Sequence, residues 1–99
     1  MLLIRDIMYC KPGKVRPLIE KFLAVGKLAE RAGWGKMRCM TDVAADRYWT
    51  LVSEMEVQDL QAFVSMDMTS PEAQEMGKLM EGYHDLVDHG RREIYKLEG

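Results

Sequence analysis

The sequence predicts an α+β domain of the ferredoxin-like type, in which a four-stranded antiparallel sheet carries two helices on one face. Apolar residues recur either at alternate positions or with the period of an α-helix, and these patterns follow one another in the order β-α-β-β-α-β. Turn signals with glycine or proline separate most of the segments. With 99 residues the chain has no length left for a linker or a second unit, so residues 1–99 are expected to form a single domain.

The first two elements are a strand and a helix. Residues 2–10 mix β-branched and aromatic side chains and stop before Pro12-Gly13, a strong turn signal, so they predict a strand. After this turn, apolar residues recur every three or four positions, as on one face of an amphipathic helix. Pro17 falls in the first turn of that helix, where a backbone N–H would have no hydrogen-bond partner within the helix. Gly33 is expected to end the helix.

Two strands are expected next, over residues 36–43 and 48–57, with residues 44–47 as a short connection. The second strand alternates well, so its side chains divide between the two faces of the sheet. One face takes Trp49, Leu51, Ser53, Met55 and Val57. The other face takes Tyr48, Thr50, Val52, Glu54 and Glu56.

The last part of the chain predicts a short helical turn, a longer helix and a final strand. The helical turn covers residues 58–66. Ser70 followed by Pro71 is typical of a helix start, and an apolar stripe extends that helix to about Asp88. Residues 91–97 then alternate as the last strand.

One face of the predicted sheet has no cover. Right-handed crossovers in this element order place both helices on the same face. The opposite face presents Tyr48, Thr50 and Val52 from the third strand. An exposed apolar sheet face usually meets a partner, and two-fold symmetry is the commonest way to close an assembly. We therefore expect a homodimer that forms through the open sheet face.

The charge balance and the cysteines exclude several classes of protein. The chain has 14 Lys and Arg against 16 Asp and Glu, so it lacks the basic excess typical of nucleic-acid binding. It shows neither an apolar run that could cross a membrane nor the pattern of a signal peptide. Cys10 and Cys39 form no metal-ligand or disulfide motif. We expect a cytoplasmic protein with reduced thiols, no metal site and no contact with membranes or nucleic acid.

Two short segments, Tyr9-Cys10-Lys11-Pro12-Gly13-Lys14-Val15 and Arg91-Arg92-Glu93-Ile94-Tyr95, resemble the dimeric α+β-barrel superfamily. Within it, the chain is similar to NIPSNAP-type domains and to antibiotic-biosynthesis-type monooxygenases, over nearly its full length by element order. The resemblance implies a homodimer that holds a small apolar or aromatic molecule. Some members of the superfamily are oxygenases that need neither metal nor flavin, so no cofactor is expected.

His84 is the candidate catalytic residue. Helical spacing within the segment 71–88 places it on or beside the buried stripe, and Gly77, one to two turns earlier, leaves room above its ring. There it would act as a general base or orient a ligand. The alternative is a half-buried structural histidine near the helix end. His89, which precedes Gly90, is expected to stabilise the helix C-terminus.

Five further side chains are candidates for the wall of a ligand pocket, namely Arg5, Tyr9, Trp49, Met80 and Tyr83. Aromatic rings with polar tips suit a planar ligand, and methionine adapts to apolar ligands of variable shape. Structural alternatives stand beside these roles. Trp49 and Met80 would fill the core, and Arg5 would pair with Glu54 on a neighbouring strand rather than bind a ligand carboxylate.

Two functions remain open at this point. The first is a homodimer that binds a small aromatic or apolar compound, with cofactor-independent monooxygenation as the activity that the resemblance implies. The second is a non-enzymatic binding or assembly module. A buried pocket of roughly 300 Å3 or more would favour the first function, and a cavity filled by side chains would favour the second.

Overall fold

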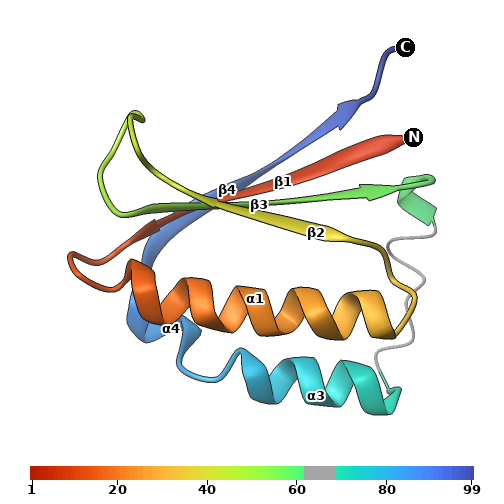
Figure 1. Cartoon of the computed structure of the whole chain (residues 1–99), viewed down its shortest axis with the longest axis horizontal. Helices are drawn as coiled ribbons and strands as arrows, with labels where there is room; N and C mark the ends of the chain where they lie inside the picture. The colour runs from red at the N-terminus through yellow and green to blue at the C-terminus, as the bar shows by residue number, and fades with distance from the viewer. Residues whose placement is uncertain (62–68) are drawn as a thin grey trace.

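The computed structural model describes residues 1–61 and 69–99, and it confirms the ferredoxin-like α+β class. The elements are, in chain order, β1 (Leu2–Cys10), α1 (Val15–Arg31), β2 (Met37–Thr41), β3 (Thr50–Val57), α3 (Pro71–Leu79), α4 (Tyr83–Leu86) and β4 (Val87–Lys96). The four strands form one antiparallel sheet in the spatial order β2-β3-β1-β4. Helices α1 and α3 lie along the same side of that sheet (Figure 1).

The core lies between α1 and the sheet. Leu18 and Phe22 of α1 pack against Met8 and Cys10 of β1, and the Leu18 side chain is completely buried. Burial of a side chain of this size contributes roughly 1.5–3 kcal/mol to folding. Because side chains alternate along a strand, the even-numbered residues of β1 face the helices and the odd-numbered residues face the open side of the sheet.

Strand β3 divides its side chains between the two faces as the sequence predicted. Asp6 of β1 lies opposite Ser53, and Met8 lies opposite Leu51. Ser53 and Leu51 therefore belong to the helix-facing side, together with Met55. The open side takes Thr50, Val52 and Glu54.

The two middle strands are shorter than predicted. Strand β2 ends at Thr41 and β3 begins at Thr50, whose N–H donates a hydrogen bond of 2.9 Å to the Asp42 side chain. Trp49 has a φ of 60°, a left-handed backbone that does not fit a strand, and its side chain is 42% exposed. The predictions that Trp49 belongs to the strand face and fills the core are therefore wrong, and Tyr48 lies in the connection as well.

The prediction of one continuous helix over residues 71–88 is wrong. Helix α3 ends at Leu79, and Gly82 has a φ of 83°, which glycine adopts readily and which breaks the helical path. The short helix α4 follows, and β4 already begins at Val87 because the strand pairs with the whole length of β1. His89 consequently lies in a strand and not at a helix C-terminus.

Other predicted boundaries are confirmed. Strand β1 covers the predicted residues 2–10. The Ser70 hydroxyl accepts a hydrogen bond of 3.1 Å from the Ala73 N–H, and Pro71 takes the first helical position of α3. The predicted helical turn over residues 58–66 lies largely outside the described residues. Within the described ranges, the structure contains no helix with the length and apolar character needed to span a bilayer.

Candidate functional site

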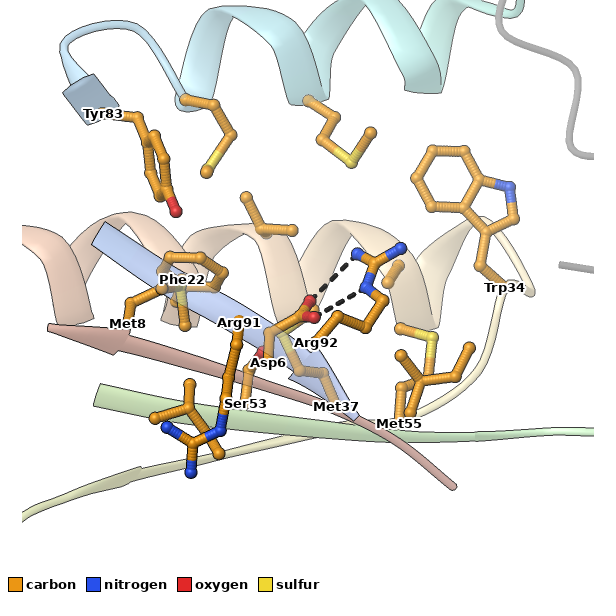
Figure 2. A pocket seen from close by; sticks show the side chains of 17 residues that line it. Asp6, Met8, Phe22, Trp34, Met37, Ser53, Met55, Tyr83, Arg91 and Arg92 are labelled. Carbon is orange, nitrogen blue, oxygen red and sulfur yellow. Dashed lines mark hydrogen bonds and ion pairs between the residues drawn. The ribbon is translucent and has the colours of Figure 1, made fainter. Parts of the chain in front are cut away.

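A cavity of about 830 Å3 lies between the helices and the sheet, and we call it the helix–sheet cavity (Figure 2). Trp34 lies at one end of it and Tyr83 at the other. The wall is mostly apolar, with polar groups confined to a few positions on the sheet and to Tyr83. Its apolar side chains include Ile4, Phe22, Val25, Ala29 and Trp34.

Methionine supplies much of the wall. Five of the nine methionines line the helix–sheet cavity, namely Met8, Met37, Met55, Met76 and Met80. They come from strands β1, β2 and β3, from α3 and from the residue that follows it. Their unbranched, polarisable side chains fit ligands of irregular shape. More than half of the methionines of this chain therefore lie in the wall of the helix–sheet cavity.

An ion pair between Asp6 and Arg92 forms the polar floor of the cavity. The two residues lie directly opposite each other on β1 and β4, on the helix-facing side. Arg92 donates two parallel hydrogen bonds, of 2.7 Å from Nε and 3.1 Å from Nη2, to the two carboxylate oxygens of Asp6. This bidentate bond raises the pKa of Arg92. Because the charges compensate each other, the pair adds polarity to the cavity without adding net charge.

Two hydroxyl groups accompany this pair. Ser53 lies opposite Asp6 on β3, and its side chain is buried. The Tyr83 hydroxyl points toward the sheet, and the Tyr83 ring packs edge-on against Phe22 with centroids 6.4 Å apart. Burial, the negative charge of Asp6 and the nearby Cys10 raise the pKa of Tyr83. Tyr83 therefore stays a neutral phenol that can donate a hydrogen bond to a ligand.

The predicted catalytic residue, His84, lies outside the cavity wall. Its side chain is exposed, and its ring contacts Tyr83 edge-on at 5.3 Å between centroids. The expectation that it lies on or beside a buried helix stripe is wrong, because the left-handed Gly82 separates α4 from α3 and resets the helical phase. Among the described residues, the ring of Tyr83 connects His84 to the cavity.

The predicted pocket residues divide between three places. Met80 and Tyr83 line the helix–sheet cavity. Arg5 and Tyr9 are odd-numbered residues of β1 and lie on the open side of the sheet. Trp49 lines a second, shallower hollow of about 540 Å3, with Cys10, Lys11, Pro12, Arg47, Tyr48 and Asp88.

Sequence reasoning missed Asp6, Ser53 and Arg92. Asp6 could have been found, because it is the single charged side chain among the even-numbered residues of β1. Arg92 could not, because only the register between β1 and β4 shows that it faces Asp6.

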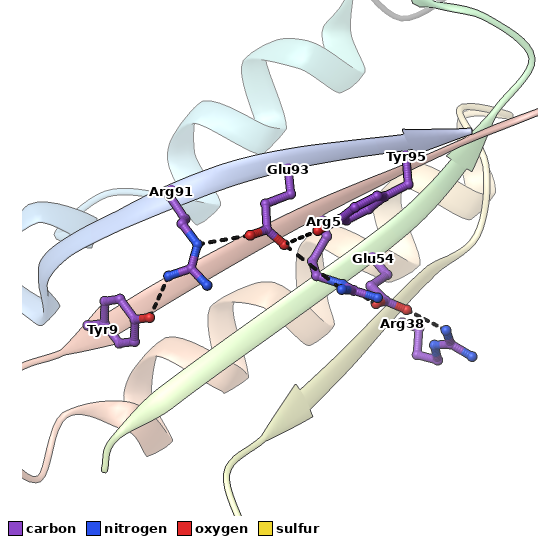
Figure 3. Close-up of polar contacts among 7 residues, drawn as sticks. All are labelled: Arg5, Tyr9, Arg38, Glu54, Arg91, Glu93 and Tyr95. Carbon is purple, nitrogen blue, oxygen red and sulfur yellow. Dashed lines mark hydrogen bonds and ion pairs between the residues drawn. The ribbon is translucent and has the colours of Figure 1, made fainter. Parts of the chain in front are cut away.

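The open side of the sheet carries an unexpected amount of charge (Figure 3). The predicted pair between Arg5 and Glu54 is confirmed, with 2.6 Å between Arg5 Nε and Glu54 Oε2. Arg38 also donates to Glu54, whose side chain is 5% exposed. The bond from Arg38 and then that from Arg5 hold the pKa of Glu54 below its ordinary value, although burial opposes this shift. The open side therefore combines ion pairs with apolar side chains such as Ile7 and Val52.

The described residues offer little to a metal ion. Residues 1–61 and 69–99 contain no group of three or more His, Cys, Asp and Glu side chains that could hold one. Cys10 and Cys39 are free thiols, and burial raises the pKa of both. The polar side chains in the described part of the cavity wall include those of Asp6, Ser53, Tyr83 and Arg92.

Comparison with solved structures gives clear matches, whereas no protein-family model and no curated protein matches the sequence. An uncharacterised NIPSNAP domain protein from Burkholderia xenovorans is 14% identical, with a TM-score of 0.75 over 99% of this chain and 95% of that chain. A candidate antibiotic biosynthesis monooxygenase from Deinococcus radiodurans is 8% identical, with a TM-score of 0.68 over 100% of this chain and 94% of that chain.

A third solved structure is described as a dimer. This protein of unknown function from Bacteroides fragilis has a ferredoxin-like fold and is 13% identical, with a TM-score of 0.67 over 97% of this chain and 96% of that chain. Identities this low bear on the fold and not on the chemistry. The chain therefore has the ferredoxin-like α+β fold that is found in NIPSNAP domain proteins and in antibiotic-biosynthesis-monooxygenase-like proteins, as its resemblance to them predicted.

Proposed function

We propose that the protein is a homodimer in which each chain binds a small, neutral, largely apolar or aromatic molecule in its helix–sheet cavity. The observation that carries this proposal is the cavity itself. Its volume of about 830 Å3 falls within the range of roughly 300–1,000 Å3 typical of small-molecule sites. Its wall also has the composition of such sites, apolar with a few convergent polar groups.

The polar groups favour a ligand with adjacent hydrogen-bond donor and acceptor atoms. Asp6 accepts hydrogen bonds, whereas Arg92 and Tyr83 donate them. A phenol, an enol or a hydroxy ketone satisfies this set without bringing charge into the cavity. A ligand carboxylate is disfavoured, because Asp6 already occupies the guanidinium of Arg92 and would repel a second anion. Met80 and Tyr83 contact the apolar body of the ligand, and His84 supports the ring of Tyr83.

The homodimer rests on the open side of the sheet. That side carries ion pairs of its own and keeps Met40 and Tyr95 exposed. The protein from Bacteroides fragilis that shares the fold is described as dimeric. When two copies stack through this face, each copy covers the open side of the other copy's sheet.

The binding proposal is tested by titration calorimetry with naphthol and naphthoate, two probes of nearly equal shape that differ in charge. Naphthol is expected to bind at least about tenfold more tightly than naphthoate, because naphthoate meets the carboxylate of Asp6. Asp6→Asn releases Arg92 from its partner and is expected to reverse the preference. Asp85→Asn, on the exposed side of α4, is the matched control and leaves both affinities unchanged. Equal affinities in the wild type, with no effect of Asp6→Asn, would contradict the proposed site.

A second candidate function is cofactor-independent oxygenation, and one observation favours it. The carboxylate of Asp6 and the phenol of Tyr83 share the cavity, so that an acidic C–H or O–H group of the ligand has both a base and a hydrogen-bond donor within reach. In such a reaction, O2 converts a CH2 group that is acidified by conjugation with a carbonyl, as in anthrone, to a second carbonyl and releases water. The substrate supplies all the electrons, and O2 is the oxidant.

Oxygen uptake with anthrone separates the remaining functions. A lower rate of oxygen uptake in Tyr83→Phe and Asp6→Asn than in the wild type supports the oxygenase. A lower rate in His84→Ala as well would show that His84 contributes to the reaction. Binding of naphthol without oxygen uptake would support a protein that binds its ligand without oxidising it. Absence of both favours the non-enzymatic assembly module.

A further inference from the structure

Four side chains of alternating charge form a row across the open side of the sheet, one from each strand (Figure 3). We call Arg38, Glu54, Arg5 and Glu93 the charge row. Arg38 lies opposite Glu54 on the neighbouring strand, Glu54 lies opposite Arg5, and Arg5 lies opposite Glu93. From β2 to β4 the signs are plus, minus, plus and minus.

Each neighbouring pair in the charge row is in contact. Arg38 and Arg5 both donate to Glu54. Arg5 Nη1 lies 3.9 Å from Glu93 Oε1, and Arg91 of the same strand as Glu93 lies closer, with 3.0 Å between Arg91 Nε and Glu93 Oε2. Glu54 is 5% exposed and Glu93 is 27% exposed, whereas Arg38 at the β2 end keeps 71% of its side chain exposed. The single chain has therefore already removed much of the row from water, and the end at Arg38 remains accessible to a further anion.

The order of the signs makes the charge row complementary to itself in one orientation only. Consider two sheets stacked face to face around a two-fold axis that runs parallel to the strands. This axis reverses the strand order, so that β2 of one copy lies over β4 of the second. Arg38 then faces Glu93 of the second copy, and Glu54 faces Arg5. An axis parallel to the row would instead place each charge over its own equivalent and repel.

We propose that the charge row fixes the symmetry of the homodimer, with the two-fold axis parallel to the strands and with Arg38 paired to Glu93 of the second copy. This inference rests on the homodimer in the proposed function. The adjacent row consists of Met40, Val52, Ile7 and Arg91. In the same orientation, Val52 faces Ile7 of the second copy and Met40 faces Arg91. Buried charge pairs of this kind contribute more to orientation and partner choice than to affinity.

The alternation also argues against other partners. An acidic or basic peptide requires one sign of charge over several strands, and the row instead alternates at every strand. A second copy of the chain carries the inverse order of charges at the same spacing, and it is therefore the partner that the row fits.

Two charge reversals test the inference through a mixing experiment. Arg38→Glu and Glu93→Arg are purified separately, and the dissociation constant of each dimer is measured by sedimentation equilibrium beside the wild type. Each variant is expected to dimerise at least about tenfold more weakly, since like charges then face each other in both pairs.

An equimolar mixture of the two variants is expected to recover wild-type affinity. In the mixed dimer, the glutamate introduced by Arg38→Glu in one chain meets the arginine introduced by Glu93→Arg in the other. The unaltered Glu93 of the first chain and the unaltered Arg38 of the second form the other pair, so opposite charges face each other at both places. Native mass spectrometry identifies the mixed dimer.

A matched pair of substitutions controls for effects of charge alone. Arg31 and Glu75 form an exposed ion pair of 2.8 Å between α1 and α3, away from the open side of the sheet. Arg31→Glu and Glu75→Arg are expected to leave the dissociation constant unchanged. If a charge-reversed chain fails to fold by circular dichroism, Arg38→Gln and Glu93→Gln replace the reversals. These neutral variants are each expected to weaken the dimer several-fold, with partial recovery on mixing.

The outcomes separate the inference from the proposals on which it rests. A monomeric wild type overturns both the homodimer and the charge row, while ligand binding in each cavity is measured independently. A dimeric wild type with reversals that change nothing overturns the charge row alone. Two weakened variants whose mixture does not recover overturn the proposed axis.

Discussion

Asp6 and Arg92 face each other across β1 and β4 and share two hydrogen bonds on the side of the sheet that the helices cover. Both residues line the helix–sheet cavity. The alternation of β1 aims Asp6 toward the helices while Arg5, one residue earlier, belongs to the open side. Adjacent residues of one strand thus belong to two different surfaces, the wall of the helix–sheet cavity and the open side of the sheet.

Asp6→Asn is expected to change ligand preference far more than stability. The side chains of Asp6 and Arg92 are 28% and 50% exposed, so solvent screens the pair and its loss lowers the free energy of unfolding by only about 0.5–1 kcal/mol. Urea denaturation measures this change, with Asp85→Asn as the control. A loss above about 3 kcal/mol would instead mark the pair as part of the folding core.

Leu18→Ala is expected to lower the free energy of unfolding by about 2–5 kcal/mol, because it opens a void beside Met8 and Leu51 in the core. Leu23→Ala is the control within the same helix, since the Leu23 side chain is 51% exposed. It is expected to stay within about 0.5 kcal/mol of the wild type. Equal effects of the two substitutions in urea denaturation would contradict the assignment of the buried face of α1.

Gly90→Ala is expected to destabilise the sheet, because a Cβ at this position would lie 2.6 Å from the carbonyl oxygen of Ile7. That atom belongs to the backbone of a paired strand and cannot move without disturbing the ladder, so a loss of roughly 1–3 kcal/mol is expected. Gly77→Ala on α3 meets nothing within 4 Å and should stabilise the protein by about 0.5–1 kcal/mol. Thermal melts of the two variants should therefore shift in opposite directions. A shift in the same direction would contradict the close approach of β4 to β1.

Glu54 is expected to make stability depend on acid pH. Its pKa in the folded chain lies below the ordinary value of 4.5, so the charged form is favoured by folding. The stabilisation is therefore complete above that value and is lost as the pH falls through the lower pKa of the folded state. Glu54→Gln should flatten the decline in unfolding free energy between about pH 5 and pH 3, measured in urea. Wild type and variant with parallel declines would show that the arginines do not stabilise this carboxylate.

Much of the fold could be predicted from local patterns. Strand β1, helix α1 with its buried face, the cap at Ser70 and the pair between Arg5 and Glu54 all follow from spacing and residue type. The first three depend on residues that are close in sequence. The pair between Arg5 and Glu54 depends also on the register of β1 against β3. The helix break at Gly82 was not predicted from the sequence. A glycine late in an apolar stripe is compatible with a continuous helix, and only the structure shows that Gly82 has a left-handed backbone.

The candidate site was harder to predict because it depends on register. Met80 and Tyr83 carry the chemical features of a pocket wall, and the structure places both in the cavity. Asp6 and Arg92 are separated by 86 positions, and nothing local to either residue indicates the other. The connection before β3 adds a similar difficulty, since the left-handed backbone at Trp49 removes an aromatic residue that alternation had placed on the strand face.

Methionine methyl spectroscopy during a titration with naphthol tests ligand binding in the helix–sheet cavity most directly. The aromatic ring of the probe shifts nearby methyl resonances, and each methionine is assigned by substitution with leucine. Binding in the cavity is expected to shift the signals of the five cavity residues Met8, Met37, Met55, Met76 and Met80, and to leave exposed Met1 and Met40 unchanged. Shifts confined to Met40, on the open side of the sheet, or no shifts at saturating naphthol would contradict a ligand site between the helices and the sheet.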